Sequence, residues 1–208
     1  ACYLLAARPE VQERIRAEAR ETELLAPHGE AACAVALGEE PATEDGESFI
    51  DALPYTRRVW QETIRLYPPL PVFGRTADTD TTVGGETLAE GTHVLISPYV
   101  THRDPEFWDD PGTFDPSRFE PEAVAGRHEL AYLPFSKGRH ACLGETIATT
   151  EAVAALAALC STYRVEFARP HDVAPDEFDP HEAPHVELDS AINLQPDRDL
   201  CVRFTPLE

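Results

Sequence analysis

Cys142 is the residue of this 208-residue chain with the setting best suited to chemistry. It lies in the glycine-punctuated stretch from Pro134 to Gly144, PFSKGRHACLG, directly before an alanine-rich segment whose composition favours a helix. At a helix start, unpaired backbone N–H groups favour the thiolate over the thiol and can hydrogen-bond the sulfur. We therefore expect a sulfur that binds a metal. The alternative is a buried, inert thiol, the usual state of a free cysteine.

The neighbours of Cys142 suit a flat ligand beside that metal. Gly138 and Gly144 lack a Cβ, so the backbone on both sides of the cysteine can turn sharply and approach the ligand closely. Phe135 can supply an aromatic wall, and His140 can donate a hydrogen bond to an anion. An ordinary surface imidazole is the alternative for His140.

The stretch 135–144 resembles the haem-binding signature F-x-x-G-x-[RH]-x-C-x-G of the cytochrome P450 family of haem-thiolate monooxygenases. Ser136 departs from the family, which more often has glycine there. The resemblance implies haem b (iron protoporphyrin IX) as the cofactor and Cys142 as the axial ligand of the haem iron. It also implies that His140 pairs with a haem propionate. The cofactor-binding residues of this loop would then be Phe135, Gly138, His140, Cys142 and Gly144.

Two further stretches resemble signatures of that family. Glu62 and Arg65 form E-x-x-R before a Pro-Pro pair, and Arg118 lies in P-x-R-F at 116–119. Read from spacing alone, Glu62 and Arg65 are an exposed i, i+3 ion pair worth ~0.2–0.5 kcal/mol. The resemblance implies instead a buried network of Glu62, Arg65 and Arg118 on the proximal side of the haem. Removing one partner of a buried pair costs ~3–5 kcal/mol.

Three other basic residues take roles from the resemblance. Arg75 follows a proline-rich turn where the family commonly carries an arginine that reaches a haem propionate; a plain strand-edge arginine is the alternative. Lys137 and Arg139 flank Gly138 and form a small positive spot on a strongly negative protein. We expect them to help dock an acidic ferredoxin, against the alternative of two solvated charges. His102, in the peptide THRDP, is interpreted as structural.

Several elements must position these residues. Helices are predicted over 9–21, where Pro9 suits the first helical position, and over 54–67, closed by a Pro-Pro pair. A third helix is predicted from Cys142 to about Thr162, packing through a face made by Leu143, Ile147, Ala148, Ala155, Leu156 and Leu159. Cys160 is expected in its core. Residues 72–100 have β texture, with tight turns at Gly84-Gly85 and Gly91.

The remaining segments are predicted as one strand, a hairpin and two loops. A strand is expected over 163–167, and the final stretch AINLQPDRDLCVRF resembles the family's C-terminal hairpin, with its turn at Pro196-Asp197. Residues 22–47 are expected to be a surface loop with room for a short helix over 30–37, and 169–188 an acidic loop. The histidines of the second loop lack a metal-ligand spacing and are interpreted as solvated: His171, His181 and His185.

The predicted fold class is mainly α with small β-sheets (α+β). The resemblance covers nearly the whole chain, residues 1–208, as a partial domain: the C-terminal half of the cytochrome P450 fold, from the end of its central helix to its C-terminal hairpin. The family's [AG]-G-x-[DE]-T motif, which assists proton delivery to oxygen, does not occur in this sequence. We therefore expect the proximal, thiolate-donating face without the distal, oxygen-activating face, and we assign no catalytic residue.

The amino-acid composition narrows the classes of molecule that this chain is expected to bind and the compartment in which it is expected to work. A formal net charge of −21, from 38 acidic and 17 basic residues, disfavours binding to nucleic acid or anionic membranes. Such acidity resembles proteins of salt-loving organisms; an ordinary acidic cytoplasmic protein is the alternative. The five cysteines are odd in number and form no C-x-x-C, so neither a disulfide framework nor a zinc or iron–sulfur site is predicted. No apolar run approaches the ~20 residues of a membrane span, so a cytoplasmic protein is expected.

The resemblance implies an oxidoreductase that inserts one oxygen atom from O₂ into a small organic substrate, with electrons from a ferredoxin or flavoprotein. A peroxide-driven variant is also conceivable within this class. The alternative is a catalytically silent, truncated haem-binding or interaction module. The substrate is not predicted, because the residues that would shape its pocket are mostly absent from the sequence.

Overall fold

The computed structural model describes residues 1–22, 51–168, 188–190, 193–196 and 199–207. The predicted loop at 22–47, apart from its first residue, and nearly all of the one at 169–188 lie outside these residues, as do the three histidines of the second loop. The helices are α1 (Cys2–Ala6), α2 (Pro9–Glu21), α4 (Pro54–Leu66), α5 (Pro98–Thr101), α6 (Pro121–Ala125) and α7 (Glu145–Thr162). Three 3₁₀ turns are η1 (Pro116–Phe119), η2 (Glu129–Ala131) and η3 (Gly138–His140). The strands are β1 (Phe73–Thr76), β2 (Thr81–Val83), β3 (Glu86–Leu88), β4 (His93–Ile96), β5 (Tyr163–Phe167), β6 (Leu188–Ser190), β7 (Leu194–Pro196) and β8 (Val202–Pro206).

Prolines set the starts of the first two predicted helices, and both helices are confirmed. Pro9 and Pro54 each occupy the first helical turn, where a missing N–H costs no intrahelical bond. Along α2, Val11, Ile15 and Ala19 repeat at intervals of four residues and are all buried. The helix therefore presents one apolar stripe to the core and an acidic and basic face to solvent.

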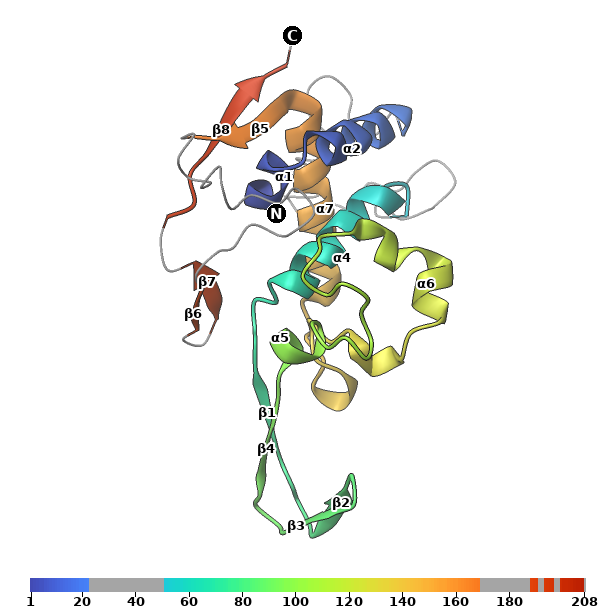
Figure 1. The fold of residues 1–208 in the computed structure, drawn as a ribbon, viewed down its shortest axis with the longest axis vertical. Coiled ribbons are helices and arrows are strands. Elements are labelled where there is room, and N and C mark those ends of the chain that lie inside the picture. Colours follow the sequence, from blue (N-terminus) through green and yellow to red (C-terminus); the bar gives the residue numbers. More distant parts are fainter. Residues whose placement is uncertain (23–50, 169–187, 191–192, 197–198, 208) are drawn as a thin grey trace.

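The core lies between α1, α2, α4 and α7, which gather in one half of the molecule (Figure 1). Its largest cluster joins Leu5, Ile15, Val59, Leu66 and Leu156, drawn from all four helices. Burying each such side chain stabilises the fold by roughly 1.5–3 kcal/mol. Because α4 contributes to this cluster, packing against α1, α2 and α7 fixes the helix that carries Glu62 and Arg65.

Helix α7 confirms the predicted helix, but its predicted face is only partly right, because Leu156 of that face is buried whereas Leu143 and Ile147 are exposed. The side chains that it buries are Thr150, Val153, Ala154, Leu156, Ala157 and Cys160. Leu143, just before the helix, is fully exposed at 101%, and Ile147 is 63% exposed. Apolar residues occur around the whole of this alanine-rich helix, so their periodicity does not select one face. Contacts with α2 and α4 make the choice. Cys160 is buried in the core, as predicted.

The predicted small sheet of residues 72–100 is confirmed as two antiparallel pairs. Strand β1 pairs with β4, with Arg75 opposite Val94, and β2 pairs with β3. The two pairs form the long arm that extends from the helices in Figure 1. Gly84 and Gly85 make the β2–β3 turn with φ of 59° and 88°, a left-handed conformation in which glycine carries no steric penalty.

The predicted C-terminal hairpin is wrong in its pairing. Strand β7 pairs with β6, which precedes it, and β8 pairs with β5, the strand that follows α7. The segment 188–206 is therefore divided between two sheets (Figure 1). Strand β5 confirms its prediction, and its buried Val165 lies opposite Phe204 of β8.

Gln12 joins the helices to this second sheet. Its side-chain amide is buried, and Nε2 donates to the carbonyls of Leu5 at 2.7 Å and Val165 at 2.9 Å. The Val165 N–H in turn donates to Gln12 Oε1 at 2.9 Å. One side chain thus satisfies both backbone groups of a strand residue.

The segment from α5 to η3 is mostly irregular and leads from the β arm to Cys142. It packs its own small cluster of Trp108, Phe119 and Ala131 and contacts α4 through η1. Within the described ranges, no helix combines the length and apolar character that crossing a membrane requires.

Candidate functional site

The loop that carries Cys142 is closed by backbone hydrogen bonds. The Cys142 N–H donates to the Phe135 carbonyl at 2.9 Å, and the Ala141 N–H donates to the Gly138 carbonyl at 3.0 Å. Gly138 has φ of 75°, and this left-handed conformation explains why glycine is needed there. The Cys142 side chain is exposed. The structure therefore places the thiol on the outside of a tightly turned loop.

The expected position of Cys142 at a helix start needs correction. Helix α7 has Gly144 as its N-cap and begins at Glu145, so two residues, Leu143 and Gly144, separate Cys142 from the helix. The contact between them is a hydrogen bond of 3.4 Å from the Glu145 N–H to the Cys142 carbonyl. A Cβ built on Gly144 would lie 3.8 Å from Cys142 Sγ, an ordinary contact distance, and its φ is −87°. Neither the sulfur nor the backbone conformation therefore demands glycine at 144.

Ser136 has a contact that sequence reasoning missed. Its φ is 63°, which is uncommon for a residue with a side chain and accounts for the family's preference for glycine. Its Oγ accepts a hydrogen bond of 2.7 Å from Arg75 Nη2. The Arg75 guanidinium also lies over the Phe73 ring, 4.8 Å from its centroid. Strand β1 is thereby tied to the cysteine loop, and Arg75 lies beside the loop at half-buried depth.

Glu62 and Arg65 form a fully buried ion pair. Arg65 Nε donates to Glu62 Oε2 at 2.6 Å and Nη2 donates to Oε1 at 2.8 Å, with both side chains 0% exposed. The Asp115 N–H also donates to Glu62 Oε1. Arg118 Nε lies 3.6 Å from the same oxygen, a longer ion-pair contact, and its Nη2 donates to the Asp110 carbonyl. The three residues named from sequence are therefore brought together.

Protonation of this pair follows from its contacts. Burial raises the pKa of the Glu62 carboxyl, while the hydrogen bonds from Arg65 and the Asp115 N–H act in the opposite direction. Both carboxyl oxygens accept hydrogen bonds, which is the geometry of an ionised carboxylate. The remaining Arg65 donors bond three backbone carbonyls, those of His102, Pro111 and Thr113. Arg65 thus organises the irregular segment around α4.

His102 is completely buried and hydrogen-bonded at both ring nitrogens. Nδ1 lies 3.1 Å from the Arg65 carbonyl, and Nε2 accepts the Leu133 N–H at 2.8 Å. Because Nε2 accepts, the ring is the neutral tautomer with its proton on Nδ1. Burial lowers its pKa from 6.5 to about 4, and the charges of Arg65 and Arg103 act in the same direction. The peptide THRDP was the sequence signal for this position.

The other predicted residues lie on the outer part of the loop. Lys137, Arg139 and His140 are exposed, and Phe135 is partly buried. Lys137 Nζ lies 4.0 Å from Glu129 Oε2, at the outer limit of an ion pair between two exposed side chains. These positions leave the three cationic or imidazole side chains accessible to a partner molecule.

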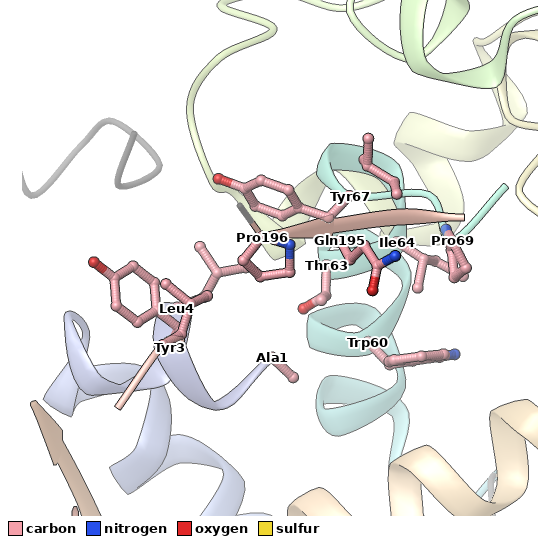
Figure 2. Close-up of a pocket in the computed structure, with 12 residues that line it drawn as sticks. Ala1, Tyr3, Leu4, Trp60, Thr63, Ile64, Tyr67, Pro69, Gln195 and Pro196 are labelled. Atoms are coloured by element: carbon pink, nitrogen blue, oxygen red, sulfur yellow. The ribbon is translucent and has the colours of Figure 1, made fainter. Parts of the chain in front are cut away.

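Of two cavities formed by the described residues, the larger borders the cysteine loop and the smaller shares no residue with it. One, of about 560 Å³, lies behind the loop, and its walls include Tyr132, Phe135, Ser136 and Lys137. The other, of about 260 Å³, is mainly apolar, and Figure 2 shows it between α1, α4 and β7. Trp60 and Ile64 from α4 line it, as do Tyr67, which directly follows α4, and Pro196. Cys142 lines neither cavity.

Among the described residues, no group of three or more His, Cys, Asp or Glu side chains is placed to hold a metal ion.

Comparison with known proteins identifies the family. The family model "Cytochrome P450" matches residues 1–182. Mouse Cytochrome P450 4V2 is 38% identical over 164 residues, which are 79% of this chain and 28% of that protein. Cyclooctatin synthase from Streptomyces melanosporofaciens is 43% identical over 116 residues, which are 56% of this chain and 25% of that protein. The chain therefore spans under a third of the length of these relatives.

Solved structures agree with the family model. The crystal structure of a cytochrome P450, CYP102L1, superposes with a TM-score of 0.72 at 27% identity and covers 99% of this chain and 41% of that one. The retinoic acid-bound cyanobacterial CYP120A1 superposes with a TM-score of 0.74 at 24% identity, which shows the shared fold. The predicted fold class, a mixture of helices and small sheets forming part of the P450 fold, is confirmed. This chain belongs to the cytochrome P450 family.

Proposed function

We propose that this chain, as one partial domain, supplies the thiolate ligand and the proximal scaffold of a haem-thiolate monooxygenase. Such an enzyme inserts one oxygen atom from O₂ into a small organic substrate. The observation that carries the proposal is the exposed Cys142 thiol on a loop fixed at both ends. A structural cysteine would instead be buried, as Cys160 is, where burial raises the thiol pKa to about 12.

The residues around Cys142 fit a porphyrin. Leu143, which directly follows Cys142, is fully exposed, and Ile147 in the first turn of α7 is largely exposed. Exposed apolar side chains next to a thiol are what a flat, mostly apolar macrocycle would cover. On the β1 side, Arg75 presents a five-donor guanidinium, of which two hydrogen bonds go to Gly74 and Ser136. Its charge suits a carboxylate at the edge of the ring.

The residues would divide the binding of haem b among them. Cys142 would ligate the iron, Phe135 would pack against the ring, and the Gly138 turn, with Gly144 beyond it, would give the backbone its close approach. Arg75 and His140 would each bind a propionate. When bound, haem supplies O₂ activation, to which a thiolate ligand contributes electron density that favours O–O cleavage. The Glu62, Arg65 and Arg118 network would hold the loop's support in place.

The electron donor would dock on the outer loop. Lys137 and Arg139 are exposed on either side of Gly138, on a chain of net charge −21. A local positive spot on such a surface would orient an acidic ferredoxin or flavoprotein at the thiolate side. Reversing one charge with Lys137→Glu should slow reduction by the donor and reduce its dependence on ionic strength. Unchanged reduction rates would exclude this role.

Composition supports two further parts of the proposal. The four cysteines within the described ranges are unpaired, which suits a reducing cytoplasm. The excess of acidic over basic residues suits a protein that works in concentrated salt.

The test is the absorption spectrum of the reduced, CO-bound protein, measured on the full-length protein that contains this chain. Wild type should show the band of a thiolate-ligated haem, and Cys142→Ser should lose it. Cys201→Ser is the matched control, because Cys201 is unpaired and lies near β8, and it should leave the band unchanged. Failure of the wild type to take up haem, or an unchanged band in Cys142→Ser, would overturn the proposal.

A further inference from the structure

The stretch that enters the cysteine loop is held from behind by one imidazole. Leu133, two residues before Phe135, donates its N–H to His102 Nε2 at 2.8 Å. The Tyr132 ring stacks on the His102 ring, with centroids 5.2 Å apart and planes inclined by 29°. The Tyr132 hydroxyl donates to the Gln61 carbonyl at 3.1 Å. Residues 132–133 are therefore fastened to α4 and to His102 together.

The other side of the imidazole is fastened to the buried ion pair. His102 Nδ1–H donates to the Arg65 carbonyl, and Arg65 Nη1 donates to the His102 carbonyl at 2.7 Å. The two residues are 37 positions apart in sequence and bond each other in both directions. Arg65 is itself held by Glu62. The position of the imidazole is thus set by the most buried polar group of α4.

A short path connects this imidazole to the sulfur. Leu133 is bonded to His102, Phe135 follows two residues later, and the Phe135 carbonyl accepts the Cys142 N–H at 2.9 Å. Every step is a hydrogen bond or a few covalent bonds of backbone. We propose that His102 is a positioning residue for the Cys142 thiolate, because it fixes the backbone that carries Phe135 and Cys142 relative to α4.

The hydrogen bonds at both ring nitrogens of His102 favour a positioning role over simple filling of a cavity. A residue that only fills a cavity needs no bonds at both ring nitrogens to backbone groups from two distant segments. His102 has both, one as donor and one as acceptor, and the acceptor bond serves a buried backbone N–H. Loss of the acceptor would leave the Leu133 N–H without its partner, and the loop entrance would be free to shift.

The test compares three substitutions at position 102. His102→Gln places an amide oxygen near the position of Nε2 and can still accept from Leu133. His102→Asn keeps a donor near Nδ1 but is too short to reach Leu133, and His102→Phe keeps the ring without either bond. Amide hydrogen exchange of the haem-free protein should be at least roughly tenfold faster at Leu133 and Cys142 in the Asn and Phe variants. The Gln variant should stay close to wild type.

The second readout is spectroscopic and rests on the proposed haem-thiolate function. In the haem-loaded full-length protein, the thiolate-ligated fraction of the reduced CO complex should fall at least twofold in the Asn and Phe variants and recover in Gln. His128→Gln is the matched control, because His128 is exposed and accepts the N–H of Leu130, only two residues away. It should change neither readout.

The outcomes separate this proposal from the previous one. If wild type binds no haem through sulfur, the proposed function fails, while hydrogen exchange still tests the position of His102. If the Asn and Phe variants exchange at Leu133 and Cys142 as wild type does and keep its thiolate fraction, the positioning role is overturned. If the Phe variant does not fold, the comparison of Asn with Gln decides, and equal behaviour of those two also overturns it.

Discussion

The residues on the two sides of the cysteine loop differ in how completely the chain buries them and pairs their polar groups. Behind the loop, Glu62, Arg65 and His102 are fully buried and bonded to one another and to backbone carbonyls. In front of it, the Cys142 thiol and the Leu143 side chain are exposed. The chain satisfies the buried polar groups behind the loop with its own residues and leaves the thiol in front exposed. Stability and ligand binding should therefore respond to different residues, and the following predictions test this separation.

The largest effect on stability is expected from the buried residues behind the loop, Glu62, Arg65 and His102, which form its support. Replacing Arg65 by Met leaves the buried Glu62 carboxylate with the Asp115 N–H and the longer Arg118 contact, and it leaves three backbone carbonyls without a donor. The free energy of unfolding should fall by about 3–5 kcal/mol. Urea denaturation monitored by circular dichroism measures this change.

Arg57 provides the control on the same helix. It pairs with Asp51 at 3.6 Å, and the two side chains are 46% and 58% exposed. Arg57→Met should cost less than about 1 kcal/mol. Equal losses for the two variants would contradict the view that the buried pair fixes the support.

Acid should weaken the support through His102. Its pKa is about 4 in the folded protein and 6.5 in the unfolded chain, so below pH 6.5 the unfolded chain binds a proton that the folded protein does not. Stability present at neutral pH is therefore lost as pH falls, by about 2 kcal/mol between pH 6.5 and 5. The groups facing the ring include the stacked Tyr132 and the cationic Arg65 and Arg103, whose charges lower the His102 pKa, while the hydrogen bond to the Arg65 carbonyl acts in the opposite direction.

The measurement is the free energy of unfolding of wild type and His102→Gln at several pH values. The Gln variant does not titrate at this position, so the difference between the two proteins should narrow towards acid pH. Parallel pH profiles would exclude His102 as the source of this acid sensitivity.

Side chains in front of the loop should behave in the opposite way. Ile147→Ser should change the stability of the haem-free protein by less than about 0.5 kcal/mol, because the side chain is already 63% exposed. Haem affinity should fall roughly tenfold, since a covered apolar side chain contributes about 1.5–3 kcal/mol. Haem titration measures this, with Val83→Ser on the distant β2 strand as the exposed control. Equal affinities in the two variants would contradict the placement of haem over α7.

The smallest effect is expected at Ser136, between the two sides. Ser136→Gly relieves a left-handed backbone but loses the hydrogen bond to Arg75, and the two changes should offset to within about 1 kcal/mol. Ser136→Ala keeps the backbone cost and loses the bond, so it should be less stable than the Gly variant by about 1 kcal/mol. Thermal unfolding measures both, and a more stable Ala variant would refute the strain at this position.

Local signals predicted the elements well because they act over a few residues. Pro9 and Pro54 mark helix starts, and the positive φ of Gly84, Gly91 and Gly138 follows from positions where the chain must turn. The association of Glu62, Arg65 and Arg118 came instead from the resemblance to the family signatures, because spacing alone predicts an exposed pair of Glu62 and Arg65. The proline and glycine predictions needed no knowledge of which element packs on which.

Long-range choices were not predictable from the sequence. The alanine-rich α7 is apolar around its circumference, so α2 and α4 decide which face is buried. The pairing of β8 with β5 rather than β7 depends on a strand almost forty residues away in the sequence. The buried environment of His102 is likewise created by α4 and the stretch before the loop, which the peptide THRDP does not reveal.

The amide of Gln12 has a consequence for the buried edge of the second sheet. Strand β5 is bonded to β8 along one edge, and Gln12 occupies the backbone groups of Val165 on the other. Val165 is only 1% exposed, because α1 and α2 cover this edge. Gln12 thus does for Val165 what a neighbouring strand would do, and shortening it to alanine would leave a buried N–H and a buried carbonyl without their partner.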